Sequence, residues 1–134
     1  MSSPVRFRAA DHDGTSTAWP SALAVSATFN TATAKAWGVA MGEEFFGKGS
    51  NVQLGPGVCV ARVPRNGRNF EYLSGEDPML GATMVVPVVT GIQSQNVIAN
   101  VKHYVNNNQV DIHYLSLYVV LSSYNSGDQP RRSE

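Results

Sequence analysis

The segment Asn51–Pro78, N-V-Q-L-G-P-G-V-C-V-A-R-V-P-R-N-G-R-N-F-E-Y-L-S-G-E-D-P, is the most informative stretch of this chain. It predicts a strand over Val52–Leu54, a long polar loop, and a helix that starts at Asp77-Pro78 with a carboxylate cap and a proline at its first position. The loop is rich in arginine, asparagine and glycine, and loops with so many directional donors usually hold a ligand. We therefore expect a binding site on this loop.

The segments on either side of the loop predict an α/β architecture. Ser21–Phe29 is interpreted as a short buried strand or a packed turn, and Asn30 offers an N-cap oxygen to a helix that runs to about Gly47. The expected buried stripe of that helix consists of Ala34, Trp37, Met41 and Phe45. Val97–Tyr104 is nearly continuous in apolar character, as parallel strands covered on both faces are. Strands that alternate with helices at short spacing are typical of an α/β fold.

Donor side chains lie at the ends of these expected strands or just beyond them. They are Arg68 in the loop and the adjacent pair Lys102 and His103 after the later strand. Such groups can bind a polar ligand, because they give hydroxyl oxygens charge-assisted hydrogen bonds worth about 1.5–3 kcal/mol each. The alternative is a structural ion pair between these cations and Glu71 or Asp77. The sequence thus predicts that two strands deliver donors to one rim.

Composition limits the classes of partner. The chain has 134 residues, ten basic and ten acidic side chains, and 43% hydrophobic residues, which is ordinary for one globular domain or part of one. Zero net charge without a run of like charges argues against nucleic acid and against an acidic membrane. Met1–Arg6 lacks the apolar core of a signal peptide. Cys59 is the single cysteine, and its apolar surroundings predict a buried structural thiol.

No cofactor or metal is expected. Gly42–Lys48 matches the front of a phosphate-binding loop, but Gly49 stands where a serine or threonine must bind magnesium, and the motif ends a helix instead of opening one. His12 lies between two aspartates, and Asp111 and His113 share a face if their segment is extended. Neither group has a third ligand at a recognisable spacing, so surface polar residues explain them better.

Three stretches of sequence resemble a known family. They are Ala40–Gly55 (A-M-G-E-E-F-F-G-K-G-S-N-V-Q-L-G), Arg62–Pro78 (R-V-P-R-N-G-R-N-F-E-Y-L-S-G-E-D-P) and Gly91–Gln109 (G-I-Q-S-Q-N-V-I-A-N-V-K-H-Y-V-N-N-N-Q). They are similar to the N-terminal catalytic domain of glycoside hydrolase family 3, the β-glucosidase family. The resemblance implies a partial (β/α)8 TIM-type barrel that contains only the first strands and helices. It also implies an extracellular location.

The resemblance implies roles for four residues. Arg68 matches the arginine of the family's G-R-N-F-E loop, and Lys102 and His103 match its K-H pair; these groups contact the hydroxyls of the non-reducing sugar. Glu71 would orient Arg68 or Lys102 without contacting the sugar itself. A retaining β-glucosidase also needs two carboxylates about 5–5.5 Å apart. In the family these come from a later barrel strand and from beyond the barrel, so we expect no catalytic residue in this chain.

The resemblance divides the chain in two and leaves two functions open. Residues 1–109 are expected to be a partial barrel domain, and residues 110–134 a divergent tail, because Val110–Tyr114 replaces the family's N-Q-E-type continuation. The first function is part of an enzyme that hydrolyses β-glucosides and β-glucan oligosaccharides with retention. The second is a non-catalytic carbohydrate-binding or interaction fragment. Self-association through open sheet edges is also expected, because a partial barrel leaves two strand edges unpaired. Tyr114–Tyr124 adds to this tendency, because it is uncharged, β-prone and free of proline.

Overall fold

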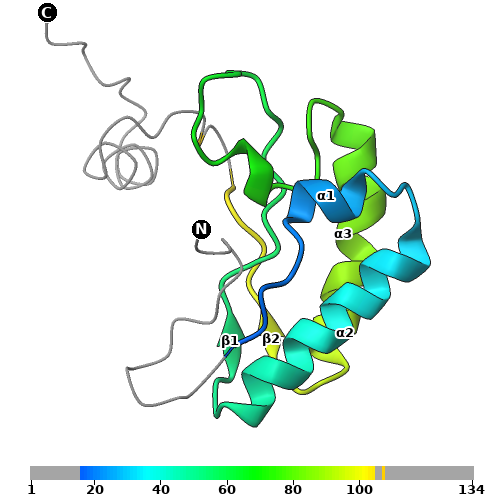
Figure 1. The fold of residues 1–134 in the computed structure, drawn as a ribbon, viewed down its shortest axis with the longest axis vertical. Helices are drawn as coiled ribbons and strands as arrows, with labels where there is room; N and C mark the ends of the chain where they lie inside the picture. Colours follow the sequence, from blue (N-terminus) through cyan, green and yellow to red (C-terminus); the bar gives the residue numbers. More distant parts are fainter. Residues whose placement is uncertain (1–15, 105–106, 108–134) are drawn as a thin grey trace, which may run out of the picture.

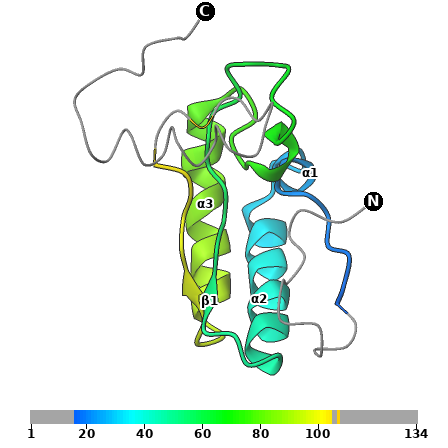
Figure 2. The ribbon, with the colours of Figure 1, turned by 90° about the vertical axis from the view of Figure 1, so that its left-hand side faces the viewer.

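The computed structural model describes residues 16–104 and residue 107 (Figure 1). Its elements, in chain order, are α1 (Ala22–Ser26), α2 (Thr31–Gly47), β1 (Val52–Gln53), the 3-10 turn η1 (Asn69–Glu71), α3 (Pro78–Gln93) and β2 (Ile98–Ala99). Helices α2 and α3 lie side by side in one layer, and the two strands form a second layer against them (Figures 1 and 2). The divergent tail predicted after Gln109 and the candidate metal ligands His12, Asp111 and His113 lie outside the described residues.

Local capping chemistry sets the ends of the two long helices. The Asn30 side-chain oxygen accepts hydrogen bonds from the backbone N–H groups of Ala32 (2.9 Å) and Thr33 (3.1 Å), and α2 then continues to Gly47. In α3 the Asp77 carboxylate accepts from the Met79 N–H at 2.8 Å, with Pro78 at the first position. These contacts satisfy backbone donors that have no partner within the helix. Both predicted helix starts are confirmed.

The expectation of a strand within Ser21–Phe29 is wrong. Ala22–Ser26 forms α1, a short helix whose N-cap Ser21 accepts a hydrogen bond from the Ala24 N–H at 3.2 Å. A capping serine followed by alanine and leucine favours a helical turn, whereas a two-residue periodicity that would favour a strand is lacking. The chain then turns at Phe29, which has a positive φ of 51° and leaves its ring exposed.

Glycines allow α2 and α3 to pack closely. A Cβ atom at Gly91 would lie 2.5 Å from the Lys35 carbonyl oxygen, and one at Gly38 would lie 2.5 Å from the Val88 carbonyl oxygen. The helices therefore meet backbone to backbone at these positions. The core around this contact contains ten buried apolar residues: Ala22, Val25, Ala34, Trp37, Met41, Leu73, Met84, Val88, Ile92 and Val97. Three of the four predicted stripe residues of α2 are in this core, and the fourth, Phe45, packs against it.

Replacing Gly91 with alanine is expected to destabilise the fold. The added methyl group would overlap backbone atoms of α2, and overpacking of this kind typically costs about 1–3 kcal/mol. Gly47→Ala is the matched control, because a Cβ there meets nothing within 4 Å and alanine favours a helix by about 0.5–1 kcal/mol. Urea-dependent proteolysis of both variants measures the difference. Equal midpoints for the two variants would contradict the close helix contact.

The sheet is parallel, and the described residues cover one of its faces. Val52 pairs with Ile98, and Gln53 pairs with Ala99. Gln53 and Val97 are buried on the helix side, whereas the opposite face exposes 42% of Val52, 69% of Leu54 and 59% of Ile98. We call these three residues the open sheet face. The expectation that Val97–Tyr104 is a long strand covered on both faces is wrong for the described chain, because only Ile98–Ala99 pairs as a strand and one of its faces has no cover.

Candidate functional site

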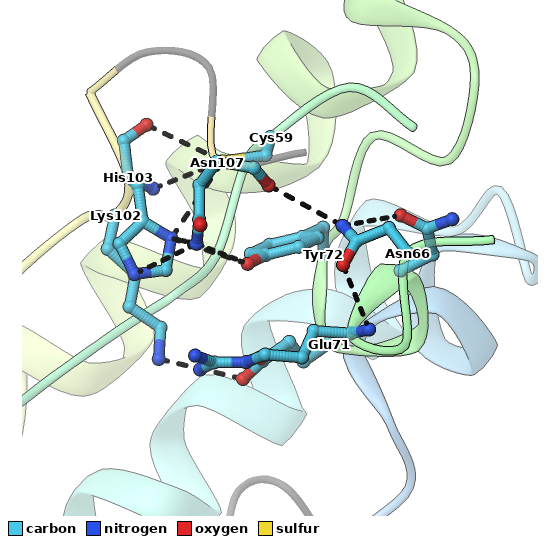
Figure 3. A network of polar contacts seen from close by, with 9 residues as sticks. Cys59, Asn66, Glu71, Tyr72, Lys102, His103 and Asn107 are labelled. Atoms are coloured by element: carbon cyan, nitrogen blue, oxygen red, sulfur yellow. Dashed lines mark hydrogen bonds and ion pairs between the residues drawn. The ribbon is translucent and has the colours of Figure 1, made fainter. Parts of the chain in front are cut away.

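Three segments meet beyond the carboxyl ends of the strands. Gly57 forms parallel bridges to both Tyr72 and Lys102, with hydrogen bonds from Val58 N to Lys102 O (2.7 Å) and from Leu73 N to Gly57 O (2.9 Å). A Cβ at Gly57 would lie 2.5 Å from the Tyr72 ring, so the central position requires a glycine. This pairing brings the polar loop and the segment after β2 to one rim, as the sequence predicts (Figure 3).

A buried carboxylate holds two cations on this rim. Glu71 is 7% exposed; its Oε1 accepts a hydrogen bond from Arg68 Nε, and its Oε2 lies 3.6 Å from Lys102 Nζ. The hydrogen bond to Glu71 raises the pKa of Arg68 above its ordinary value. The side chains of Arg68 and Lys102 remain 35% and 25% exposed. The ion pairs of the alternative interpretation therefore exist with Glu71, and they leave both cationic groups partly open to solvent.

Asp77 takes no part in these ion pairs within the described residues. Its carboxylate caps α3 instead. Glu71 is thus the carboxylate that organises the rim, and it contacts both candidate donors instead of one.

His103 lies beside this pair in a network of polar side chains. Its Nδ1 is 2.8 Å from Asn107 Nδ2 and 3.3 Å from the Tyr72 hydroxyl, and Asn107 Nδ2 also donates to that hydroxyl at 3.0 Å (Figure 3). Burial, followed by the positive charges of Lys102 and Arg68, lowers the pKa of the His103 imidazole. Burial also raises the pKa of Tyr72 to about 12. At neutral pH both groups are therefore uncharged.

Cys59 differs from its predicted role. Its thiol is half-buried instead of fully buried, and Sγ lies 3.9 Å from His103 Nδ1 and 3.4 Å from the His103 N–H. The apolar run around Cys59 suggested core packing, but the parallel pairing at Gly57 carries this residue out of the core to the edge of the rim. The peptide bonds Gly55-Pro56 and Lys102-His103 are both cis.

Asparagines hold the loop in shape. Asn66 is buried; its Nδ2 donates to Asn69 Oδ1 at 3.0 Å and to the Asn107 carbonyl oxygen at 3.4 Å. Its Oδ1 accepts from the Arg68 backbone N–H at 3.3 Å, and Asn69 Nδ2 donates to the Val63 carbonyl at 3.0 Å. These bonds order the loop without a ligand, and such preorganisation would lower the entropic cost of binding one.

Sequence reasoning did not identify Tyr72, Asn107 or Asn66. Tyr72 directly follows Glu71, and Asn107 lies four residues after His103 in a run of three asparagines. The asparagine run was a usable signal, since each carboxamide can both donate and accept hydrogen bonds. Nothing in the local pattern, however, indicates that these residues touch one another.

The described residues support binding chemistry better than hydrolysis. The rim presents a guanidinium, an ammonium group and a neutral imidazole, all of which can donate to hydroxyl oxygens. Its one carboxylate, Glu71, is already paired with two cations. Across residues 16–104 and 107, no cluster of three His, Cys, Asp or Glu side chains could hold a metal ion, and no helix has the length and apolar character needed to cross a membrane.

The chain matches a family and several curated relatives. Residues 9–120 match the family of the glycosyl hydrolase family 3 N-terminal domain. The probable β-glucosidase F of Aspergillus fumigatus is 48% identical over 108 residues, which are 80% of this chain and 12% of that protein. A β-glucosidase of Bacteroides ovatus is 47% identical over 93 residues, or 69% of this chain and 12% of that protein. The chain thus spans about an eighth of the length of these curated relatives.

Solved structures agree with this match. β-Glucosidase 3B from Thermotoga neapolitana, solved in complexes with glycerol and with glucose, superposes with a TM-score of 0.68 at 41% identity, over 75% of this chain and 14% of that one. DesR, a β-glucosidase from Streptomyces venezuelae in complex with D-glucose, superposes with a TM-score of 0.69 at 35% identity, over 72% of this chain and 12% of that one. At these levels of sequence identity, the similarity shows that the chain shares the fold of the matched segments and belongs to the same family.

Proposed function

Since the chain belongs to glycoside hydrolase family 3, we propose that it is a portion of a retaining β-glucosidase that supplies part of the site for the non-reducing sugar. Arg68, Lys102 and His103 would donate to the sugar hydroxyls, and Glu71 would hold the two cations in place. The substrates would be β-glucosides and the β-glucan oligosaccharides released from cellulose. An extracellular location is part of this proposal, and it rests on the family alone.

One observation carries the proposal: Arg68, Lys102 and His103 come from two segments and meet at one rim beside a buried carboxylate. Guanidinium and ammonium groups that keep 35% and 25% of their side chains exposed can reach a ligand without leaving Glu71. Each charge-assisted hydrogen bond to a hydroxyl would contribute about 1.5–3 kcal/mol. β-Glucosidase 3B and DesR were each solved in complex with glucose, which supports a sugar as the occupant.

The fold proposal is a partial (β/α)8 barrel. Parallel strands with helices on one face and an uncovered apolar face on the other are what a section of such a barrel would present, since the inner face is filled by side chains from other strands. The nucleophile and the acid/base carboxylate would lie outside this chain. The division into a domain over residues 1–109 and a tail over residues 110–134 stays a proposal, and the family match itself continues to residue 120.

The purified chain alone is expected not to hydrolyse aryl β-glucosides. Donors without a nucleophile cannot form the glycosyl-enzyme intermediate of a retaining enzyme. Release of the aryl alcohol measures turnover directly. Activity that copurifies with the chain and disappears in Lys102→Ala would contradict this expectation.

A chimaera supplies the positive arm of this test. Residues 17–109 of this chain would replace the matched segment of β-glucosidase 3B from Thermotoga neapolitana, to which the chain is 41% identical. We expect this chimaera to hydrolyse aryl β-glucosides, because the missing carboxylates come from the host enzyme. A chimaera that unfolds cooperatively but neither binds glucose nor turns over substrate would refute the proposed sugar site.

A further inference from the structure

We infer that Asn66 is a positioning residue whose carboxamide joins the loop that carries Arg68 to the segment that carries Lys102. We call residues 63–71 the arginine loop and residues 101–107 the lysine segment. The inference rests on the proposed function for the identity of the ligand, whereas the join itself is a property of this chain. It assigns a task to a side chain that is 7% exposed and does not need to touch the sugar.

Backbone groups fix the orientation of the Asn66 amide. The Arg68 N–H can only donate, and its nitrogen lies 3.3 Å from Asn66 Oδ1. The Asn107 carbonyl can only accept, and its oxygen lies 3.4 Å from Asn66 Nδ2 (Figure 3). Exchanging the amide oxygen and nitrogen would set a donor against a donor and an acceptor against an acceptor. The partners therefore decide which way the carboxamide points.

Asn69 supports the same orientation independently. Its Nδ2 donates to the Val63 carbonyl oxygen at 3.0 Å, so its Oδ1 is an acceptor, and Asn66 Nδ2 donates to that oxygen at 3.0 Å. The two amide hydrogens of Asn66 thus have two acceptors, one within the arginine loop and one on Asn107. A buried carboxamide with both hydrogens in use is costly to displace, because each lost partner leaves a polar group unsatisfied.

The bond to Asn107 attaches the arginine loop to the lysine segment before Arg68 in the chain. After Arg68, Glu71 pairs with Lys102, and the Tyr72 hydroxyl accepts from the Asn107 side chain at 3.0 Å. Arg68 is therefore bracketed by contacts to one and the same segment. A loop held on one side only could pivot about that contact, whereas contacts on both sides fix the position of the backbone between them.

This bracket sets the spacing of the two cations on the rim. Arg68 and Lys102 share the Glu71 carboxylate, and 35% and 25% of their side chains are exposed. A ligand that bonds to both cations needs them at a fixed separation, and small displacements of binding groups weaken such contacts. Asn66 thus acts on the ligand through the cations and not by contact.

Hydrogen exchange followed by mass spectrometry tests the join. Peptides that cover residues 63–71 and 101–107 report the arginine loop and the lysine segment, and peptides from α2 are the internal reference. In Asn66→Ala we expect exchange to become about 2- to 10-fold faster in both regions, the equivalent of one neutral hydrogen bond, and to stay unchanged in α2. The chimaera is measured beside the full chain, so the result does not depend on the yield of the isolated chain. Faster exchange confined to residues 63–71 would overturn the join.

Asn69→Ala is the matched control. It removes the bonds of Asn69 to Val63 and Asn66 but leaves the bond between Asn66 and Asn107, so we expect faster exchange in the arginine loop alone. Asn66→Asp keeps the shape of the side chain and an acceptor for the Arg68 N–H, but at neutral pH it has no donor for the Asn107 carbonyl. We expect this variant to speed exchange in the lysine segment as Asn66→Ala does. Equal exchange of that segment in Asn66→Asp and in the unaltered chain would contradict the inference.

A double-mutant cycle in the chimaera tests whether Asn66 acts through Arg68. Asn66→Ala alone is expected to lower kcat/KM for an aryl β-glucoside by about 2- to 10-fold. In the Arg68→Ala background the same change is expected to have a smaller effect, because the spacing of two cations no longer matters when one of them is gone. An equal factor in both backgrounds would refute the positioning role and leave Asn66 a residue that only stabilises the fold.

The two measurements separate this inference from the proposed function. If exchange becomes faster in the lysine segment but kcat/KM is unchanged, the join stands and the proposed contact between the rim cations and the sugar is wrong. If kcat/KM falls while exchange in the lysine segment is unchanged, the join fails and the sugar site stands.

Discussion

Replacing Lys102 or Arg68 with alanine in the chimaera is expected to lower kcat/KM for aryl β-glucosides by about 10- to 150-fold. In the proposed sugar site each change would remove one charge-assisted hydrogen bond to a sugar hydroxyl, and the range corresponds to about 1.5–3 kcal/mol per bond. Neither cation is fully buried, with 35% of the Arg68 and 25% of the Lys102 side chain exposed. A ligand on the rim can therefore reach both groups. Initial rates over a range of substrate concentrations measure the loss.

Matched variants distinguish a sugar contact from a loss of stability. Arg65→Ala and Lys35→Ala remove the same charges from exposed positions in the loop and on α2, and both are expected to leave kcat/KM within about 2-fold. Thermal unfolding of each variant is recorded beside its kinetics. If Arg68→Ala lowered the melting temperature and left kcat/KM unchanged, the interpretation of Arg68 and Glu71 as a purely structural ion pair would be correct instead.

Local sequence rules predicted the parts of the fold that depend on neighbours in the chain. Asn30 and Asp77 cap the two long helices as expected, because a capping side chain acts on N–H groups two or three residues away. The same kind of reasoning failed for Ser21–Phe29. A nine-residue apolar stretch is compatible with a strand or a helix, and the serine cap that decided the outcome was read as part of a short strand or a packed turn.

The donors of the candidate site could be named from the sequence, and the polar network around them could not. Arg68, Lys102 and His103 follow from residue type and from the family resemblance, whereas the contact of Asn107 with Tyr72 joins positions 35 residues apart. That contact depends on the register in which Gly57 pairs with Tyr72 and Lys102. Register between parallel segments is set by tertiary packing, so the polar partners of His103 could only be found in three dimensions.

The isolated chain is expected to give almost no soluble protein or a self-associated species. The open sheet face leaves Val52, Leu54 and Ile98 in solvent, and among the described residues the sheet has only two strands, each with one unpaired edge. Exposed edges beside an apolar face are templates for association, because another chain can complete both the hydrogen bonds and the packing. Size-exclusion chromatography with light scattering measures the association state. A monodisperse monomer with a cooperative thermal transition would contradict the expectation and favour the stand-alone carbohydrate-binding function.

Ile98→Lys is expected to have opposite effects in the isolated chain and in the chimaera. In the isolated chain the lysine places a charge on the open sheet face. We expect a larger monomeric fraction, since charges on an edge strand oppose pairing between chains. In the chimaera the same face would be enclosed by the other barrel strands, where an unpaired charge is costly, and we expect loss of soluble, active enzyme.

Phe46→Lys on α2 is the control, because it removes a ring that is 57% exposed from a different surface. If both lysines raised the monomeric fraction equally, general charge and not the sheet face would control association. If Ile98→Lys left the chimaera active, the face would lie outside any barrel, and the proposed fold would be wrong at the strand that carries Lys102 and His103.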